Sequence, residues 1–223
     1  MNKKRYKDAF ERATPERKKQ VLEIATAEFS NKGYENANIN VIAKKVGISV
    51  GLMYKYFATK EDLFITCLQR GMNILDNVIN EILISDDKLL NKAEKLIRAI
   101  CCLSKKNENY IKLYNEITNE KGSELVKTLA QEIEKRTSKI YITAIAQALA
   151  KGDVRDDLNP RYFAFFLDNL LTTLQFSFTC DYYKERLKIY TDVDIENLDD
   201  EEIVTQLLKF IESAFTFQKD IKE

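Results

Sequence analysis

The stretch NINVIAKKVGISVGLMYKYF, residues 38–57, has the most regular pattern of apolar and capping residues in this chain. Its apolar positions have the i, i+3, i+4, i+7 spacing of one helical face: Ile39, Ile42, Ala43 and Val46. Asn38 can cap the start of this helix and Gly47 can end it. Ser49 can then cap a second short helix that runs towards Phe57. Two short helices joined by a tight glycine turn predict a helix-turn-helix.

In a helix-turn-helix the second helix presents its N-terminal residues to the major groove of DNA. Lys55 supplies a charge on that helix, Gly51 leaves room for close approach of the backbone, and tyrosine hydroxyls can donate to phosphate oxygens. Lys60 can add a charge at the start of the next helix, where free amides favour an anion. The candidate DNA-binding residues are therefore Asn38, Ser49, Val50, Gly51, Tyr54, Lys55, Tyr56 and Lys60.

Charge is distributed unevenly along the chain, although the 35 Lys and Arg balance the 35 Asp and Glu. Residues 1–70 hold 14 Lys and Arg against 8 Asp and Glu, and the remainder of the chain holds 21 against 27. Such a run of basic residues is usually only a solvated surface. Beside a helix-turn-helix it indicates that the N-terminal part meets a polyanion.

Outward from the motif, the whole chain has helical patterns. Thr14 and Pro15 open a helix that ends at Gly33, and Thr59 caps a long helix after the motif. Asn159 and Pro160 open another helix. With only 6 Gly and 2 Pro in 223 residues, the chain favours helices with few, short connections. The prediction is an all-α protein with a helix-turn-helix domain at 1–60 and a larger helical ligand-binding and dimerisation domain at 61–223.

The segments from Gly33 to Phe57 and from Lys60 to Phe64 resemble the TetR family of bacterial transcriptional regulators. The resemblance covers about 15–65, and two positions depart from it. Ala37 and Asn38 stand where the family often has Thr, and Lys55 stands where it often has His. The resemblance implies a three-helix DNA-binding head, followed by a helix that links it to an all-α body that binds ligand and dimerises.

Several classes of site are not expected. The chain has no His, which removes a Ser-His-Asp triad and any His-based zinc site. Its cysteines, Cys67, Cys101, Cys102 and Cys180, form no CxxC pair. The prediction is no catalytic residue, no metal and no cofactor, hence no enzyme. We also expect a cytoplasmic protein, because no signal peptide follows Met1 and no membrane span is found.

The last two helices, expected at about 160–180 and 202–218, are too apolar for an ordinary surface. They could be core of one chain, but a protein that reads palindromic half-sites favours a homodimer in which both helices form a four-helix bundle with their copies. Polar residues interrupt the first of them, and aromatic residues lie nearby. The candidate ligand-binding residues are Tyr114, Phe166, Asn169, Thr173 and Phe176.

The expected function is a ligand-responsive, DNA-binding transcriptional regulator. In this hypothesis a homodimeric repressor leaves a palindromic double-stranded operator when a small, apolar effector binds its C-terminal domain. The alternative is a helical module whose basic head binds a protein or a membrane. Sequence-specific DNA binding distinguishes the two.

Overall fold

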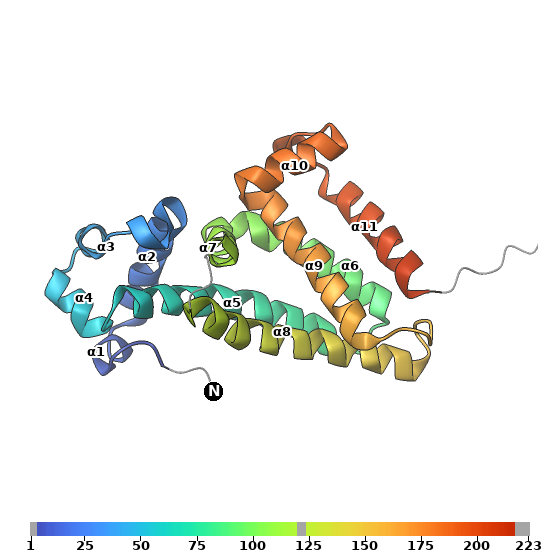
Figure 1. The fold of residues 1–223 in the computed structure, drawn as a ribbon, viewed down its shortest axis with the longest axis horizontal. Coiled ribbons are helices and arrows are strands. Elements are labelled where there is room, and N and C mark those ends of the chain that lie inside the picture. The colour runs from blue at the N-terminus through green and yellow to red at the C-terminus, as the bar shows by residue number, and fades with distance from the viewer. Residues whose placement is uncertain (1–3, 120–123, 217–223) are drawn as a thin grey trace, which may run out of the picture. The chain divides into compact units, whose positions relative to one another are not determined.

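The computed structural model describes residues 4–119 and 124–216, and within these ranges it contains helices and no strand. This confirms the expected all-α class. The elements are α1 (Asp8–Glu11), α2 (Pro15–Asn36), α3 (Ile39–Val46), α4 (Val50–Tyr56), α5 (Lys60–Ile84), α6 (Leu89–Lys106), α7 (Glu108–Asn119), α8 (Glu124–Lys151), α9 (Pro160–Thr179), α10 (Asp181–Thr191), the 3-10 helix η1 (Ile195–Asn197) and α11 (Asp200–Phe215) (Figure 1).

The chain divides into two compact units. The N-terminal unit comprises residues 1–74 and 107–127, and the C-terminal unit comprises residues 75–106 and 128–223. Helix α5 contributes residues to both, and α7 belongs to the N-terminal unit. The expected functional division at residue 60 remains a prediction, because these units are defined by compactness and not by what each part binds.

In the N-terminal unit, α2 and α5 enclose a core of apolar side chains. Phe29 has no exposed surface, and its ring lies edge-on to that of Phe64 at 5.1 Å. As expected, Thr14 caps α2 and Pro15 occupies its first turn. The helix is interrupted near its end at Gly33, which has a φ of 71°. This positive φ is unfavourable for any residue with a side chain, whereas the nearby Glu116 carboxylate, 2.7 Å from a Cβ, is the end of a flexible side chain that can move.

Helix α7 packs against α2 and α5, and it comes so close to Gly71 of α5 that no residue larger than glycine fits there. A Cβ on Gly71 of α5 would lie 2.5 Å from Cδ1 and 2.7 Å from Cγ of the Tyr110 ring. Across the same packing, the Ser30 hydroxyl of α2 donates to the Asn109 side chain at 3.0 Å. The absence of a side chain at Gly71 therefore sets how closely α7 approaches α5.

In the C-terminal unit, α6 packs against both α9 and α11 (Figure 1). The buried residues along α6 share one face and include Leu96, Ile97 and Ile100. The C-terminal end of α5 is capped by a buried lysine in this unit. Lys92 Nζ donates a hydrogen bond to the Leu83 carbonyl at 2.8 Å. This bond satisfies a helix-end carbonyl that has no intrahelical partner.

The four cysteines are free thiols, as expected, and Cys102 is the exposed one. No described helix is both long enough and apolar enough to cross a bilayer.

Candidate functional site

The predicted helix-turn-helix is formed by α3 and α4. The Asn38 side chain accepts from the Asn40 amide at 2.8 Å, and that of Ser49 accepts from the Leu52 amide at 3.1 Å. Gly47 adopts the left-handed conformation, with φ 76° and ψ 34°. Both predicted caps and the glycine turn are therefore confirmed.

Contacts from α1 and α2 hold this motif in place. The Arg17 guanidinium donates to the Val46 carbonyl at 3.0 Å, which satisfies the end of α3. Lys7 Nζ donates to the Tyr54 carbonyl at 3.0 Å, at the end of α4. Both cations lie in the basic N-terminal run, so part of that run stabilises helix ends.

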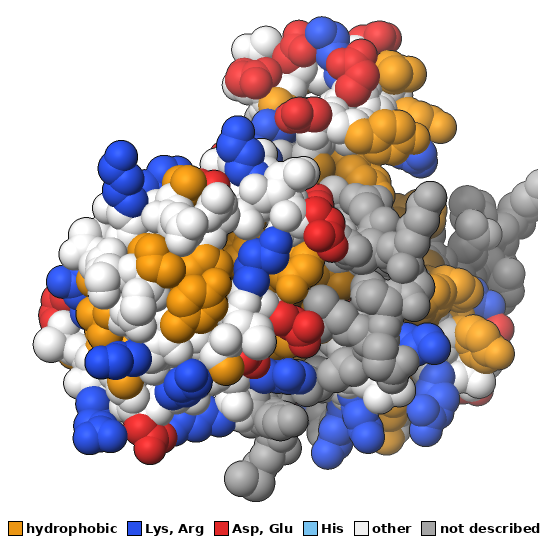
Figure 2. All heavy atoms as spheres, turned by 60° about the vertical axis from the view of Figure 1, so that its left-hand side comes forward, with side chains coloured by type: hydrophobic (Ala, Val, Ile, Leu, Met, Phe, Trp, Pro, Cys, Tyr) orange, Lys and Arg blue, Asp and Glu red, His pale blue; other side chains and the backbone are white. Residues whose placement is uncertain are grey.

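Most of the predicted DNA-binding residues share the solvent face of α3 and α4. Side chains or backbone are exposed at Asn38, Ser49, Gly51, Tyr54 and Lys55, and Val50 is half-buried. Figure 2 looks at the molecule from this side and shows many Lys and Arg side chains with fewer acidic ones between them. The face can therefore meet a polyanion.

Gly51 has no structural need to be glycine. A Cβ there would meet a single side-chain atom within 4 Å, Ser49 Oγ at 3.9 Å. Glycine costs about 0.5–1 kcal/mol relative to alanine inside a helix. The open space beside Gly51 leaves the backbone at the start of α4 accessible, and contact between Gly51 and DNA stays a prediction.

Tyr56 has a packing role. It is 8% exposed, and its ring lies 5.3 Å from that of Phe10. The Tyr56 carbonyl also accepts from the Lys7 amide at 2.9 Å. Contact between Tyr56 and DNA remains a prediction, but Tyr54, which is 47% exposed, is the tyrosine with an accessible side chain.

The side chain of Lys60 points to the C-terminal end of α2. Its ammonium donates to the Tyr34 carbonyl at 2.7 Å and to the Glu35 carbonyl at 3.0 Å. It also lies 4.6 Å from the centre of the Tyr34 ring, a cation–π contact. The predicted phosphate contact of Lys60 is untested. These bonds give Lys60 a structural role at the end of α2, which the sequence pattern did not reveal.

Replacing Lys60 with Met is expected to lower the melting temperature by about 2–6 °C, because it leaves helix-end carbonyls of α2 without their donor. Lys44 provides the matched control, since it is an exposed lysine in the same unit. Lys44→Met should leave the melting temperature unchanged in differential scanning calorimetry. An unaltered melting temperature for Lys60→Met would show that the ammonium is free to serve DNA.

Lys44, which is not among the predicted DNA-binding residues, is an exposed cation on α3. It differs from its neighbour Lys45, whose ammonium pairs with the buried Glu28 carboxylate at 2.7 Å. The apolar stripe of α3 marks both lysines as exposed and cannot show the pairing of Lys45, because Glu28 lies on α2.

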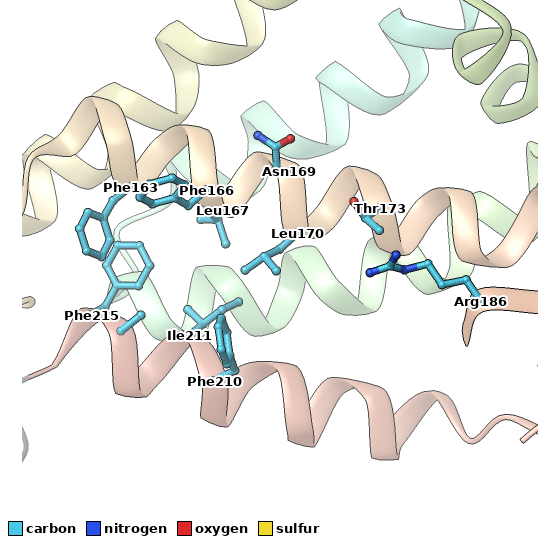
Figure 3. Close-up of a pocket in the computed structure, with 11 residues that line it drawn as sticks. Phe163, Phe166, Leu167, Asn169, Leu170, Thr173, Arg186, Phe210, Ile211 and Phe215 are labelled. Atoms are coloured by element: carbon cyan, nitrogen blue, oxygen red, sulfur yellow. The ribbon is translucent and has the colours of Figure 1, made fainter. Parts of the chain in front are cut away.

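A groove lies between α9 and α11 in the C-terminal unit, with a volume of about 630 Å³ (Figure 3). Its lining is mostly apolar and includes Phe163, Phe166, Leu170, Phe210 and Phe215. Polar groups come from Asn169 and Thr173 on α9 and from Arg186 on α10. The groove can therefore accept an apolar body with a few polar contacts.

Three of the five predicted ligand-binding residues, Phe166, Asn169 and Thr173, line this groove. The other two lie elsewhere. Tyr114 is on α7 in the N-terminal unit, and Phe176 is buried with its ring 5.2 Å from that of Tyr183. The structure therefore brings together three of the five residues in this groove, and the contact of all five with ligand stays a prediction.

The rim of the groove exposes large aromatic side chains. Phe165 and Phe166 on α9 are 62% and 54% exposed, and Phe210 on α11 is 61% exposed. Tyr162 continues the stripe on α9 at 63%. Apolar exposure of this extent along two helices is typical of a surface that another protein covers. The predicted second helix extended to residue 218, and residues 217–218 lie outside the described part.

The family described as "Bacterial regulatory proteins, tetR family" matches residues 21–67 of this chain. The HTH-type transcriptional regulator HbdR of Aromatoleum sp. (strain CIB) is 35% identical over 85 residues, which are 38% of this chain and 36% of HbdR. The chain thus matches little more than a third of the length of HbdR. The HTH-type transcriptional regulator YhgD of Bacillus subtilis (strain 168) is 24% identical to this chain. The alignment covers 72% of this chain and 83% of YhgD.

A likeness to solved structures extends over both units. The crystal structure of the transcriptional regulator FadR from Bacillus subtilis, in complex with stearoyl-CoA, has a TM-score of 0.71 at 19% identity. It covers 88% of this chain and 98% of that chain. The two chains therefore share a fold.

Proposed function

Because residues 21–67 match the family of bacterial regulatory proteins described as the tetR family, we propose that the chain is a ligand-responsive DNA-binding regulator of transcription, acting in the cytoplasm as a repressor. The observation that carries the proposal is the exposed face of α3 and α4, with both helices capped and Gly47 making the turn. In this arrangement α4 enters the major groove of a palindromic operator, and Tyr54 and Lys55 meet phosphates or base edges.

The affinity for DNA is expected to come mainly from phosphate contacts. The groove-facing part of α4 is small and carries one charged side chain, Lys55. Specificity then depends on Val50, Gly51 and Lys55 at base edges, and on how closely the backbone of α4 approaches the groove.

Replacing Gly51 with Ala tests this function. Alanine is a better helix former and meets no close neighbour at this position, so the melting temperature should stay the same or rise slightly. If α4 approaches the groove closely, the added Cβ should weaken operator binding about tenfold or more. The measurement is a gel shift at several salt concentrations, on the operator that the protein itself selects from a random DNA library.

The alternative module, a basic head that binds protein or membrane, predicts a different result. No DNA sequence would then be preferred, and Gly51→Ala would bind random DNA as the unaltered protein does. That outcome would overturn the proposal.

We further propose that the protein is a homodimer through α9 and α11, with the second copy covering the groove between them. The support is the exposed aromatic stripe along these helices. A dimer places two copies of α4 one helical turn of DNA apart, about 34–36 Å. Phe166, Asn169 and Thr173 then border the dimer contact, so an effector bound there would touch both copies.

Effector binding is proposed for the C-terminal unit. Since α5 is one helix with residues in both units, a ligand that prefers one conformation of the C-terminal unit can alter DNA binding through it. A preference of roughly 100-fold between two conformations supplies nearly 3 kcal/mol, which is enough to empty an operator. The bound stearoyl-CoA of FadR supports a small-molecule effector in this fold.

A further inference from the structure

The groove between α9 and α11 differs chemically from one end to the other. Figure 3 shows Phe163, Phe166 and Phe215 at one end, while at the other end the Arg186 side chain extends from α10 toward Thr173. Among the described residues that line the groove, Arg186 is the charged one. The groove is therefore apolar along most of its length and has a positive charge at one end.

The guanidinium of Arg186 is available to bind an anion. It lies 5.2 Å from the centre of the Tyr190 ring, a cation–π contact on the same helix. Within residues 4–119 and 124–216, no carboxylate pairs with it and no acceptor takes a hydrogen bond from it. A guanidinium keeps its N–H donors in its own plane, where they match the geometry of a carboxylate.

Thr173 supplies a second donor at the Arg186 end of the groove. Its side chain is exposed, and its hydroxyl has no hydrogen-bond partner among the residues that the structure describes. The other polar lining residue, Asn169, differs because its amide donates to the Phe165 carbonyl at 2.7 Å. This end therefore offers a guanidinium and a hydroxyl to the same acceptor, a combination that favours a carboxylate.

The rest of the groove suits an apolar body of moderate length. Its volume of about 630 Å³ lies within the range of sites that bind small organic molecules. Phe163 and Thr173 are ten residues apart on α9, which corresponds to about 15 Å along the helix axis. Phe166 and Phe210 are more than half exposed, so covering them with an apolar body is favourable. One lining cation matches an effector with one negative charge.

We propose that the groove binds an organic monocarboxylate, with its apolar body between α9 and α11 and its carboxylate on Arg186. The Arg186 guanidinium donates to both carboxylate oxygens, and the Thr173 hydroxyl donates to one of them. The inference rests on the proposed function, because it names the chemical class of that regulator's effector. An exposed ion pair alone contributes little, so binding also depends on the apolar body and on the second copy, which excludes water from the groove.

The first test is a thermal shift with matched pairs of probes. The acids are octanoate, decanoate and 4-phenylbutyrate, and each is compared with its neutral alcohol, octanol, decanol or 4-phenylbutanol. At least one acid should raise the melting temperature by about 3–5 °C at a concentration about ten times its Kd, and its alcohol should raise it clearly less. If no acid stabilises the protein more than its alcohol does, the proposal is overturned.

Variants of α10 show whether Arg186 is responsible. Arg186→Met removes the charge and keeps an apolar stem, so the affinity for the acid should fall about tenfold or more while that for the alcohol stays the same. Arg186→Lys keeps the charge and should retain part of the preference for the acid. The matched control is Lys188→Met, because the Lys188 ammonium already pairs with Asp194 at 2.7 Å. An equal affinity of Arg186→Met and the unaltered protein for the acid would overturn the proposal.

A third probe separates a free carboxylate from the phosphates of a coenzyme. Octanoyl-CoA has the same chain as octanoate, but a thioester replaces its carboxylate and the coenzyme adds several negative charges. The proposal predicts no shift with octanoyl-CoA that depends on Arg186. If octanoyl-CoA gives an Arg186-dependent shift and none of the free acids does, the site binds phosphate and the proposal is wrong.

Operator binding by the same proteins separates this inference from the proposed function. The stabilising acid should release the unaltered protein from its selected operator, and Arg186→Met should bind that operator normally and stay bound when the acid is added. If an operator is found but no acid-selective shift exists, the inference fails and the regulator stands. If the acid-selective shift is present but no operator is found, the regulator fails and the carboxylate site stands.

Discussion

Replacing Phe165 with Glu is expected to convert the protein to a monomer and to weaken its binding to a palindromic operator by about 100-fold or more. Phe165 is 62% exposed on α9, at the centre of the stripe that the second copy is proposed to cover. A carboxylate there would be taken out of water without a partner on association. Loss of the dimer removes the second half-site contact, and linked binding of two sites exceeds single binding by roughly 100-fold to 10,000-fold.

The matched control for this variant is Ile189→Glu. Ile189 is 68% exposed on α10, so it lies outside the two helices, α9 and α11, that are proposed to form the dimer surface. Sedimentation velocity should show a monomer for Phe165→Glu and a dimer for both Ile189→Glu and the unaltered protein. A dimeric Phe165→Glu with full operator affinity would contradict the assignment of α9 and α11 as the dimer surface.

The second large effect is expected at Gly71. Gly71→Ala would place a Cβ 2.5–2.8 Å from Cδ1, Cγ and Cβ of Tyr110, and side-chain rotation cannot move the last of these away. Forcing an extra group into a packed site typically costs 1–3 kcal/mol. For a chain of this length we expect the melting temperature to fall by about 4 °C or more in calorimetry.

Two further variants show whether the Tyr110 ring is the cause. Gly51→Ala makes the same change in an exposed helix of the same unit and should not lower the melting temperature. In the double variant, Tyr110→Ala removes the ring and keeps only Cβ, 2.8 Å from the new Cβ, so Gly71→Ala should cost clearly less in that background. If Gly71→Ala is as destabilising without the ring as with it, the close approach of α7 to α5 does not explain the effect.

The helix-turn-helix could be predicted almost entirely from sequence. Ile39, Ile42, Ala43 and Val46 are all buried, and Asn38, Gly47 and Ser49 adopt the expected caps and turn. These features are local, because each depends on residues within one or two helical turns. The apolar spacing and the capping residues therefore contain enough information to place them.

The roles of single cations could not be predicted in the same way. Lys60 reaches carbonyls 23 to 26 residues away in sequence, and Lys7 reaches one 47 residues away. Composition shows that such residues are basic, but only tertiary packing decides whether an ammonium faces solvent or a helix end. Tyr56 is a similar case, because its burial depends on Phe10 of α1.

The predicted ligand residues show the same limit in the C-terminal unit. Phe166, Asn169 and Thr173 were brought together by their common face on one helix, which spacing can predict. Tyr114 was grouped with them from composition, and it belongs to the other unit.

The most direct test of the central proposal is selection of bound DNA from a random double-stranded library by the full-length protein, followed by footprinting. The account predicts an enriched palindrome whose two half-sites lie about 10 base pairs apart from centre to centre, or a multiple of that spacing, protected on both strands. Enrichment of no sequence, with binding that depends only on salt, would contradict it.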